Sequence, residues 1–355
     1  MRRPTRTALI RTVAFVTCFV TCGGEDRADT ASPAPARRSP ARHTEALHML
    51  GEIVAEENEQ VINVAPIVFD DTDGGFLVAD LKESQVRVYE RGGALSMALG
   101  GRGDGPGEFR SPVVVHRLPD GRIVAGDFEN ARLTLFSADA DSVLDTQTPP
   151  LFLLYNAVPL SSERLLLAGR PPGAGRPPLL HIWNMTREEI ETSFFRVPVR
   201  PDLAGTALSL GFVGLDVLDD TLYATFSLTD TLYVFDLGSS PPRPAGKIPI
   251  PIEDFRIVAQ PMDASASVTA REEWLSGLTP IQAVHALPRS FLVLFGEDVG
   301  TENLWHWSHF ARDGTPLFEL RDAGQVLTTR ADTIFFIDPR AMVPNRWTYA
   351  VTRSW

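Results

Sequence analysis

The sequence predicts an all-β protein built from one repeated unit. After about residue 47, short runs rich in β-branched and aromatic residues recur, and turn residues bound each run. Six such runs are each followed by a second run of the same kind, and the first runs are spaced by 46, 42, 57, 69 and 43 residues. A basal period in the low forties is typical of a four-stranded propeller blade, so the pattern predicts a six-bladed β-propeller. The first runs are residues 76–80, 122–127, 164–168, 221–225, 290–294 and 333–337, and the second runs are 85–89, 131–136, 179–183, 231–235, 304–307 and 347–351.

Residues 1–21 have the composition of an export signal. Four arginines precede the uncharged stretch 12–21, which is far shorter than the ~20 residues that span a bilayer. Phe19-Val20-Thr21-Cys22 resembles a bacterial lipobox, which implies that Cys22 becomes lipidated and is the first mature residue. Cys18 is the rival position for the lipid, and a plain secretory signal with an incidental cysteine is the alternative interpretation.

The segment 22–46 is expected to be a disordered tether that begins at the lipidated Cys22. It is rich in alanine, proline, serine and charged residues, with almost nothing to bury. Cleavage before Cys22 removes four arginines and no acidic residue, so the net charge falls from −12 to −16. This acidity argues against a nucleic-acid partner. Residues 23–355 contain no cysteine, which excludes disulfides, thiolate metal sites and a cysteine nucleophile there.

The remaining residues, 47–355, are predicted to form the single propeller domain. The apolar segment 47–54 is expected to complete the last blade, whose own residues run out at the C-terminus. Turn residues at 73–75, 119–121 and 312–314 predict tight connections. The widest spacing contains an insertion in which Thr269 begins a capping-box pattern, so a short helix is expected to end near Gly277.

Residues 100–109, which read GGRGDGPGEF, resemble an NHL-type repeat together with Pro112, residues 118–121, Asp127, Asn130 and Arg132. The pattern is specific in the first two blades and degenerate afterwards, while the resemblance as a whole covers residues 47–355. It implies a six-bladed propeller like those of similar exported bacterial proteins. A pair of β-sandwiches would also contain many short strands, but six copies of one two-run unit favour radial repetition.

The candidate ligand site lies on the channel face of the predicted propeller. Loops that enter each innermost strand, and loops between second and third strands, gather there and contribute an acidic rim that could hold Ca²⁺. The competing interpretation is structural, because aspartates at strand ends commonly cap turns by accepting hydrogen bonds from backbone amides. The candidate ligand-binding residues are Asp80, Arg102, Asp104, Glu108, Asp127 and Asp298.

Catalytic patterns are sparse. The sequence has no serine-elbow, metalloprotease or EF-hand spacing, and we assign no catalytic residue and no metal ligand. His306 and His309 are three residues apart on a predicted strand, so they face opposite sides and are expected at exposed or edge positions of an outer strand. The six tryptophans are expected to pack between blades.

These features favour a non-catalytic binding module that is tethered to the cell envelope and presents its surface to a protein, peptide or glycan. The membrane is contacted only through the lipid anchor, and the chain is expected to be a monomer. A metal-dependent hydrolase or lyase is the first alternative, because propellers resembling this one include calcium-dependent lactonases and zinc-dependent lyases. A structural envelope protein is the second alternative.

Overall fold

The computed structural model describes most of residues 47–352. The described residues are 47–54, 64–69, 74–173, 177–198, 213–227, 229–252, 255–256, 267, 270, 274, 278–298, 303–320, 324–337 and 346–352. The expected signal segment and tether, including Cys22, lie outside them. Within the described ranges no helix is long and apolar enough to cross a membrane.

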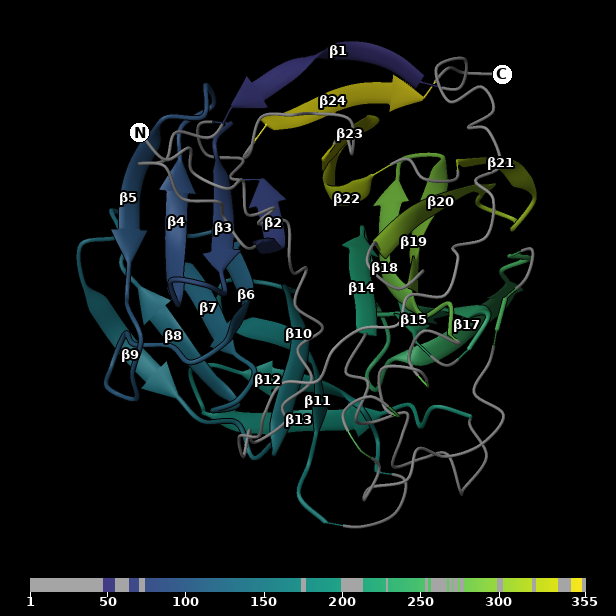
Figure 1. The fold of residues 1–355 in the computed structure, drawn as a ribbon. Coiled ribbons are helices and arrows are strands. Elements are labelled where there is room, and N and C mark those ends of the chain that lie inside the picture. The colour runs from purple at the N-terminus through teal and green to yellow at the C-terminus, as the bar shows by residue number, and fades with distance from the viewer. Residues whose placement is uncertain are drawn as a thin grey trace, which may run out of the picture.

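Twenty-four strands form six antiparallel four-stranded sheets in a propeller arrangement, which confirms the predicted all-β propeller fold (Figure 1). The first strand of each sheet contacts the first strand of the next, and the last of these contacts β2 (Val64–Phe69), so the first strands form a closed ring. Outer strands lie at the periphery (Figure 1). This radial order leaves the face of each sheet packed against its neighbours.

Five blades are continuous along the chain, and each is formed by four consecutive strands. Blade 1 contains β2, β3 (Phe76–Asp80), β4 (Gln85–Tyr89) and β5 (Leu95–Leu99); blade 2 contains β6 (Pro112–Arg117), β7 (Ile123–Asp127), β8 (Arg132–Phe136) and β9 (Val143–Gln147). Blade 3 contains β10 (Leu153–Pro159), β11 (Arg164–Arg170), β12 (Leu180–Asn184) and β13 (Glu189–Phe194). Blade 4 contains β14 (Val213–Leu218), β15 (Thr221–Phe226), β16 (Thr231–Asp236) and β17 (Arg243–Pro249). Blade 5 contains β18 (Ile281–Leu287), β19 (Ser290–Asp298), β20 (Asn303–Ala311) and β21 (Pro316–Leu320).

The remaining sheet is composite, because its strands come from two distant parts of the chain. It contains β22 (Gln325–Arg330), β23 (Thr333–Ile337), β24 (Arg346–Thr352) and, as its outermost strand, β1 (Leu47–Val54). Strands β1 and β24 pair antiparallel from Leu47 opposite Thr352 to Val54 opposite Arg346. The pairing expected for segment 47–54 is therefore present, and it joins the two ends of the domain (Figure 1).

Burial falls from the second strand of a blade to its outermost strand. All five residues of β3 and of β7 are buried, whereas three of the five residues of β5 and two of the five of β9 are exposed and only one of each is buried. Second strands lie between two neighbouring sheets and read as continuous apolar runs for that reason. Apolar clusters fill the seams between blades, and one of them joins Leu77 and Ala79 of blade 1 to Ile123 and Phe136 of blade 2.

Each of the twelve predicted runs coincides with a strand to within a few residues. The short helix expected between Thr269 and Gly277 lies mostly outside the described residues. Within that segment only Ala270 and Trp274 are described, and both have helical backbone. Trp183 and Trp307 are buried in blade seams, as predicted.

The prediction for His306 and His309 is wrong. Both are buried on β20, which is the third strand of blade 5 and is flanked by β19 and β21. His309 shares a hydrogen bond with the Ser290 hydroxyl at 2.7 Å, and its ring packs edge-on against Phe318. A third strand is covered on both faces by neighbouring sheets, so side chains that point to either face of the strand become buried.

Candidate functional site

The loop between β5 and β6, residues 100–111, is here called the junction loop. Its backbone folds back on itself: the Phe109 amide donates to the Gly101 carbonyl at 2.8 Å, and the Gly103 amide donates to the Phe109 carbonyl at 3.1 Å. The Phe109 ring is fully buried and lies 6.3 Å from the ring of Phe136. Phe109 thereby anchors the loop in the seam between blades 1 and 2.

Gly100 begins this loop in a conformation that other residues rarely adopt. Its φ is +80°, and a Cβ atom placed there would lie 2.5 Å from the Gly107 carbonyl oxygen and 2.6 Å from the Phe109 ring. Neither neighbour can withdraw easily, because one is backbone and the other is a buried ring. The glycine is therefore required by the close approach of the loop's two ends.

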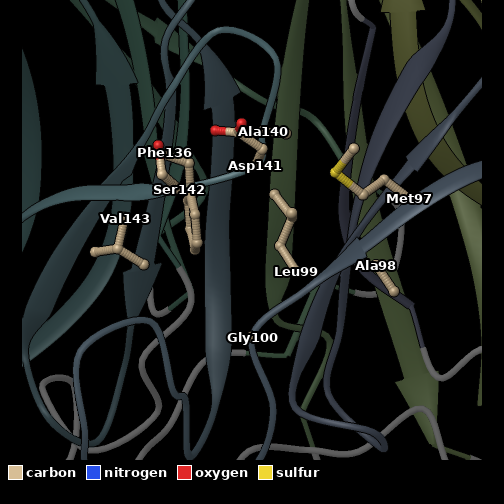
Figure 2. Close-up of a pocket in the computed structure, with 9 residues that line it drawn as sticks. All are labelled: Met97, Ala98, Leu99, Gly100, Phe136, Ala140, Asp141, Ser142 and Val143. Atoms are coloured by element: carbon tan, nitrogen blue, oxygen red, sulfur yellow. The ribbon is translucent and has the colours of Figure 1, made fainter.

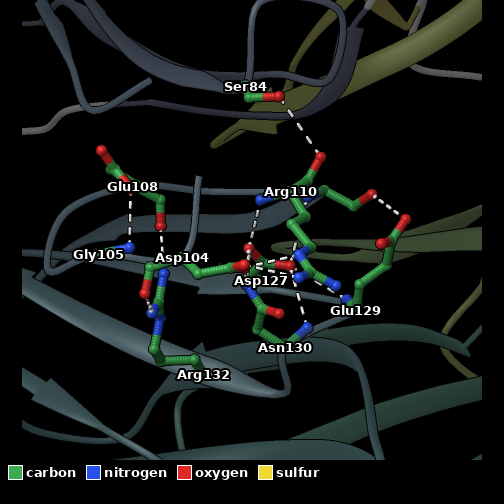
Figure 3. Close-up of polar contacts among 10 residues, drawn as sticks. Ser84, Asp104, Gly105, Glu108, Arg110, Asp127, Glu129, Asn130 and Arg132 are labelled. Carbon is green, nitrogen blue, oxygen red and sulfur yellow. Dashed lines mark hydrogen bonds and ion pairs between the residues drawn. The ribbon is translucent and has the colours of Figure 1, made fainter. Parts of the chain in front are cut away.

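Asp127 ends β7 and binds the junction loop to the β7–β8 turn (Figure 3). Its carboxylate accepts hydrogen bonds from the backbone amides of Arg110 at 2.7 Å and Ser111 at 3.3 Å. It also accepts bonds from the amides of Glu129 at 3.1 Å and Asn130 at 3.3 Å, and from the Asn130 side chain at 3.1 Å. The side chain is fully buried, so this carboxylate is saturated by its own chain.

Asp104 lies at the exposed tip of the junction loop and forms a bidentate ion pair with Arg110. Both donor–acceptor distances, from Arg110 Nε and Nη2, are 2.6 Å (Figure 3). The hydrogen bond from Arg110 lowers the pKa of the Asp104 carboxyl. The backbone carbonyls of Asp104 and Glu108 both accept hydrogen bonds from the Arg132 guanidinium, and the Glu108 carboxylate accepts one from the Gly105 amide at 2.7 Å.

Asp80 has the same turn-capping role in blade 1 that Asp127 has in blade 2. Its carboxylate accepts hydrogen bonds from the amides of Lys82 at 2.9 Å and Glu83 at 3.2 Å. The other oxygen pairs with the buried Arg87 guanidinium at 2.9 Å. Arg102 reaches this turn from the junction loop and approaches the Lys82 carbonyl at 3.4 Å. The two turns and the loop thus form one polar layer on the same face.

Five of the six candidate ligand-binding residues therefore come together, namely Asp80, Arg102, Asp104, Glu108 and Asp127. The sixth, Asp298, ends β19 opposite Asn303, but its side chain lies outside the described part of the structure. The described residues contain no group of three or more histidine, cysteine, aspartate or glutamate side chains placed to hold a metal ion. The geometry shows what each described carboxylate does instead: it orders a turn, a loop or an arginine.

A second set of polar residues, which the motifs did not indicate, links the innermost strands. His116 Nε2 donates to the Ala157 carbonyl at 2.8 Å, and Asn156 donates to the Val213 carbonyl at 2.9 Å. The Asp216 carboxylate accepts a bond from the Ala286 amide at 2.7 Å. Each bond therefore joins the first strand of one blade to that of the next. Burial raises the pKa of Asp216 to about 6 and lowers that of His116 to about 4.

A surface groove with a volume of about 370 Å³ lies between blades 1 and 2, and we call it the outer groove. One side is formed by β5 and the other by the β8–β9 hairpin, so outermost strands border it (Figure 2). Its floor includes the buried side chains of Leu99, Phe136 and Ala140. The groove is lined by Met97, Ala98, Leu99, Gly100, Phe136, Ala140, Asp141, Ser142 and Val143.

Comparisons with known proteins support the fold and leave the site unassigned. No protein-family model and no curated protein matches the chain. A solved structure from Bacteroides fragilis NCTC 9343, of a protein thought to be exported, has a TM-score of 0.63 at 13% identity and covers 90% of this chain and 98% of its own. A member of the DUF4221 family from Bacteroides vulgatus ATCC 8482 has a TM-score of 0.62 at 10% identity, covering 86% and 97%. At these identities the likeness shows the fold alone.

Proposed function

We propose that the chain is an exported, lipid-anchored binding module whose propeller contacts a protein, peptide or glycan of the cell envelope without catalysing a reaction. The supporting observation is that the candidate site is internally satisfied. Asp127 accepts five hydrogen bonds from its own chain, and Asp80 and Asp104 are each paired with an arginine. Carboxylates used in this way order the surface on which a partner could dock.

We propose that a lipid on Cys22 anchors the chain to the membrane and that the tether 22–46 links this anchor to the propeller. The basic leader, the short apolar stretch and the lipobox-like residues before Cys22 support export. The likeness to a Bacteroides protein that is thought to be exported is consistent with this localisation. The propeller would then stand off the membrane on the tether, and the lipid alone would contact the bilayer.

We further propose that the propeller is of the NHL type and has six blades, with the composite sheet as the sixth. The junction loop supports the first part, since Phe109 and Gly100 of the GGRGDGPGEF segment are fixed by packing. The β1–β24 pairing supports the second part, because it closes the ring of sheets with strands from both ends of the domain.

Two experiments test this function. Metabolic labelling with a radioactive fatty acid is expected to mark the wild-type chain and Cys18→Ala, but not Cys22→Ala, which should leave the membrane fraction. Labelling of Cys22→Ala at the wild-type level would refute the anchor. Reversible crosslinking in intact envelopes, followed by purification of the full-length protein, is expected to recover one partner in stoichiometric amounts.

A metal assay separates the binding module from the enzymatic alternative. The mature protein, purified without chelator, is expected to retain less than one equivalent of Ca²⁺ or Zn²⁺. One retained equivalent that also raises the melting temperature would favour the metal-dependent hydrolase or lyase. If crosslinking recovers no partner and deletion of the gene changes envelope integrity, the protein would instead be the structural envelope protein.

A further inference from the structure

The outermost strands of propeller sheets are edges with unpaired backbone groups, and proteins usually protect them with charged residues or proline. Five of the six outermost strands described here follow that rule. Strands β1, β9, β13, β17 and β21 each contain at least one charged residue, and two of them also contain proline. Strand β5, with the sequence LSMAL, has neither.

The unprotected strand borders the outer groove. In the described structure β5 pairs with β4 alone, so its other edge faces away from the sheet. Leu95 on β5 is 36% exposed, and Val143 across the groove is 39% exposed. Figure 2 shows Met97 and Leu99 from blade 1 and Phe136 and Val143 from blade 2 around the same hollow. An unprotected edge beside a groove with an apolar floor is the arrangement that accepts an added strand.

The charge around the outer groove indicates which kind of segment it would bind. The residues that line the groove include a single charged side chain, Asp141, which is exposed at the β8–β9 hairpin. Asp139, two residues earlier in the same hairpin, is also exposed. The Arg117 guanidinium donates to the Ala138 carbonyl at 3.0 Å, so two carboxylates of the hairpin stand against one cation and the local charge is negative. A groove of about 370 Å³ is at the small end of the range for ligand sites and accommodates a few side chains.

We propose that the outer groove binds an extended segment of a partner protein, which adds a strand to β5, places an apolar side chain over Leu99 and Phe136, and sets a lysine or arginine beside Asp141. This inference rests on the proposed binding function and assigns it to one surface and one class of partner. Main-chain hydrogen bonds to β5 would supply affinity, and the groove with Asp141 would select the sequence.

The test uses three fluorescein-labelled heptapeptides with the mature full-length protein. The first has a central leucine, a lysine two residues to each side of it, and threonine or valine at the other four positions, so that the leucine and both lysines share one face of the strand. The second replaces both lysines with glutamate, and the third is the lysine peptide with alternate backbone amides N-methylated. In fluorescence polarisation the lysine peptide is expected to bind about tenfold more tightly than the glutamate peptide, and N-methylation is expected to abolish binding.

Three exposed-residue variants locate the binding. Asp141→Lys is expected to reverse the preference, so that the glutamate peptide binds more tightly than the lysine peptide. Ala98→Lys adds to β5 the charge that the other outermost strands contain, and it is expected to weaken the lysine peptide about tenfold. The matched control is Asp313→Lys, which alters an exposed hairpin aspartate in blade 5 and should leave all three affinities unchanged. A reversed preference cannot arise from misfolding.

Several results would overturn the proposal. These are the absence of binding by every peptide, equal binding by wild type and Asp141→Lys, and an effect of Asp313→Lys as large as that of Asp141→Lys. Binding of the non-lipidated chain to phosphatidylcholine vesicles that Ala98→Lys abolishes would assign the groove to a membrane. Dimerisation in sedimentation experiments that Ala98→Lys abolishes would assign it to a second copy.

The same measurements keep this proposal separate from the proposed function. If the peptides fail but envelope crosslinking still recovers a partner from wild type and from Asp141→Lys alike, the binding module stands and the groove assignment falls. If no partner is recovered from either chain, the proposed function falls with it.

Discussion

Replacing Asp127 with alanine distinguishes a structural clamp from a ligand-binding carboxylate. The substitution removes an acceptor for four backbone amides and one side-chain amide, in a position with no exposed surface. Hydrogen bonds to a charged acceptor contribute about 1.5–3 kcal/mol each, and water will satisfy part of the loss at the loop. We therefore expect Asp127→Ala to lower the free energy of unfolding by about 3–5 kcal/mol.

The assay is urea denaturation followed by tryptophan fluorescence, with circular dichroism as a second probe. Asp127→Asn retains one oxygen acceptor but presents its amide group to backbone donors, so an intermediate loss of about 1–3 kcal/mol is expected. Asp120→Ala is the matched control in the same blade. Asp120 is exposed and pairs with Arg122 at 2.7 Å, and its loss should cost about 1 kcal/mol or less.

The reasoning would be refuted if Asp127→Ala were no less stable than Asp120→Ala. That result, together with loss of a bound metal or ligand in Asp127→Ala, would return Asp127 to the ligand-binding role that its position on the channel face first suggested. A large loss of stability with normal partner binding at low temperature would identify the residue as a clamp.

Three further predictions concern the loop and the buried titratable residues. Gly100→Ala should lower stability by about 2–3 kcal/mol in chemical denaturation, whereas Gly101→Ala, whose Cβ would meet nothing within 4 Å, should change it by less than about 0.5 kcal/mol. Burial raises the folded pKa of Asp216 from 3.8 to about 6. Its stabilising contribution is therefore complete below pH 4 and is lost as pH rises through 6. Between pH 4 and 7 the stability of Asp216→Asn relative to wild type should increase by about 3 kcal/mol. Burial lowers the pKa of His285 to about 4 from 6.5, so its contribution is complete above pH 6.5 and is lost as pH falls through 4; His285→Phe should gain about 3 kcal/mol relative to wild type between pH 7 and 4. Equal pH profiles for a variant and wild type in these denaturation series would contradict the corresponding assignment.

Local patterns predicted the strands well because the burial of each strand determines which residue types occur within that short stretch of sequence. The runs at 76–80 and 333–337 match β3 and β23 without any shift, and segment 47–54 matches β1. The junction loop could be located from its glycines and Phe109, because a buried aromatic in a glycine-rich turn is a local signal. Asp127 could be assigned both roles from sequence, and the hydrogen bonds show how it is engaged.

The remaining features depend on contacts between distant residues. Asp216 binds the amide of Ala286, which is 70 residues away in the sequence, and nothing near Asp216 indicates that partner. The outer groove joins β5 to a hairpin of the next blade, so its one local signal is the lack of charge and proline in residues 95–99. His306 and His309 show the converse, since their spacing on a predicted outer strand suggested exposed or edge positions while their place on a third strand buries them.

The most direct test of the binding function is reversible crosslinking in intact envelopes, quantified by mass spectrometry for wild type, Cys22→Ala and Asp141→Lys in parallel. The anchored binding module predicts one partner recovered in stoichiometric amounts with wild type. It predicts loss of that partner when Cys22→Ala removes the chain from the membrane. The assignment of binding to the outer groove predicts, in addition, a reduced yield with Asp141→Lys. Recovery of no partner from the wild-type chain would contradict it.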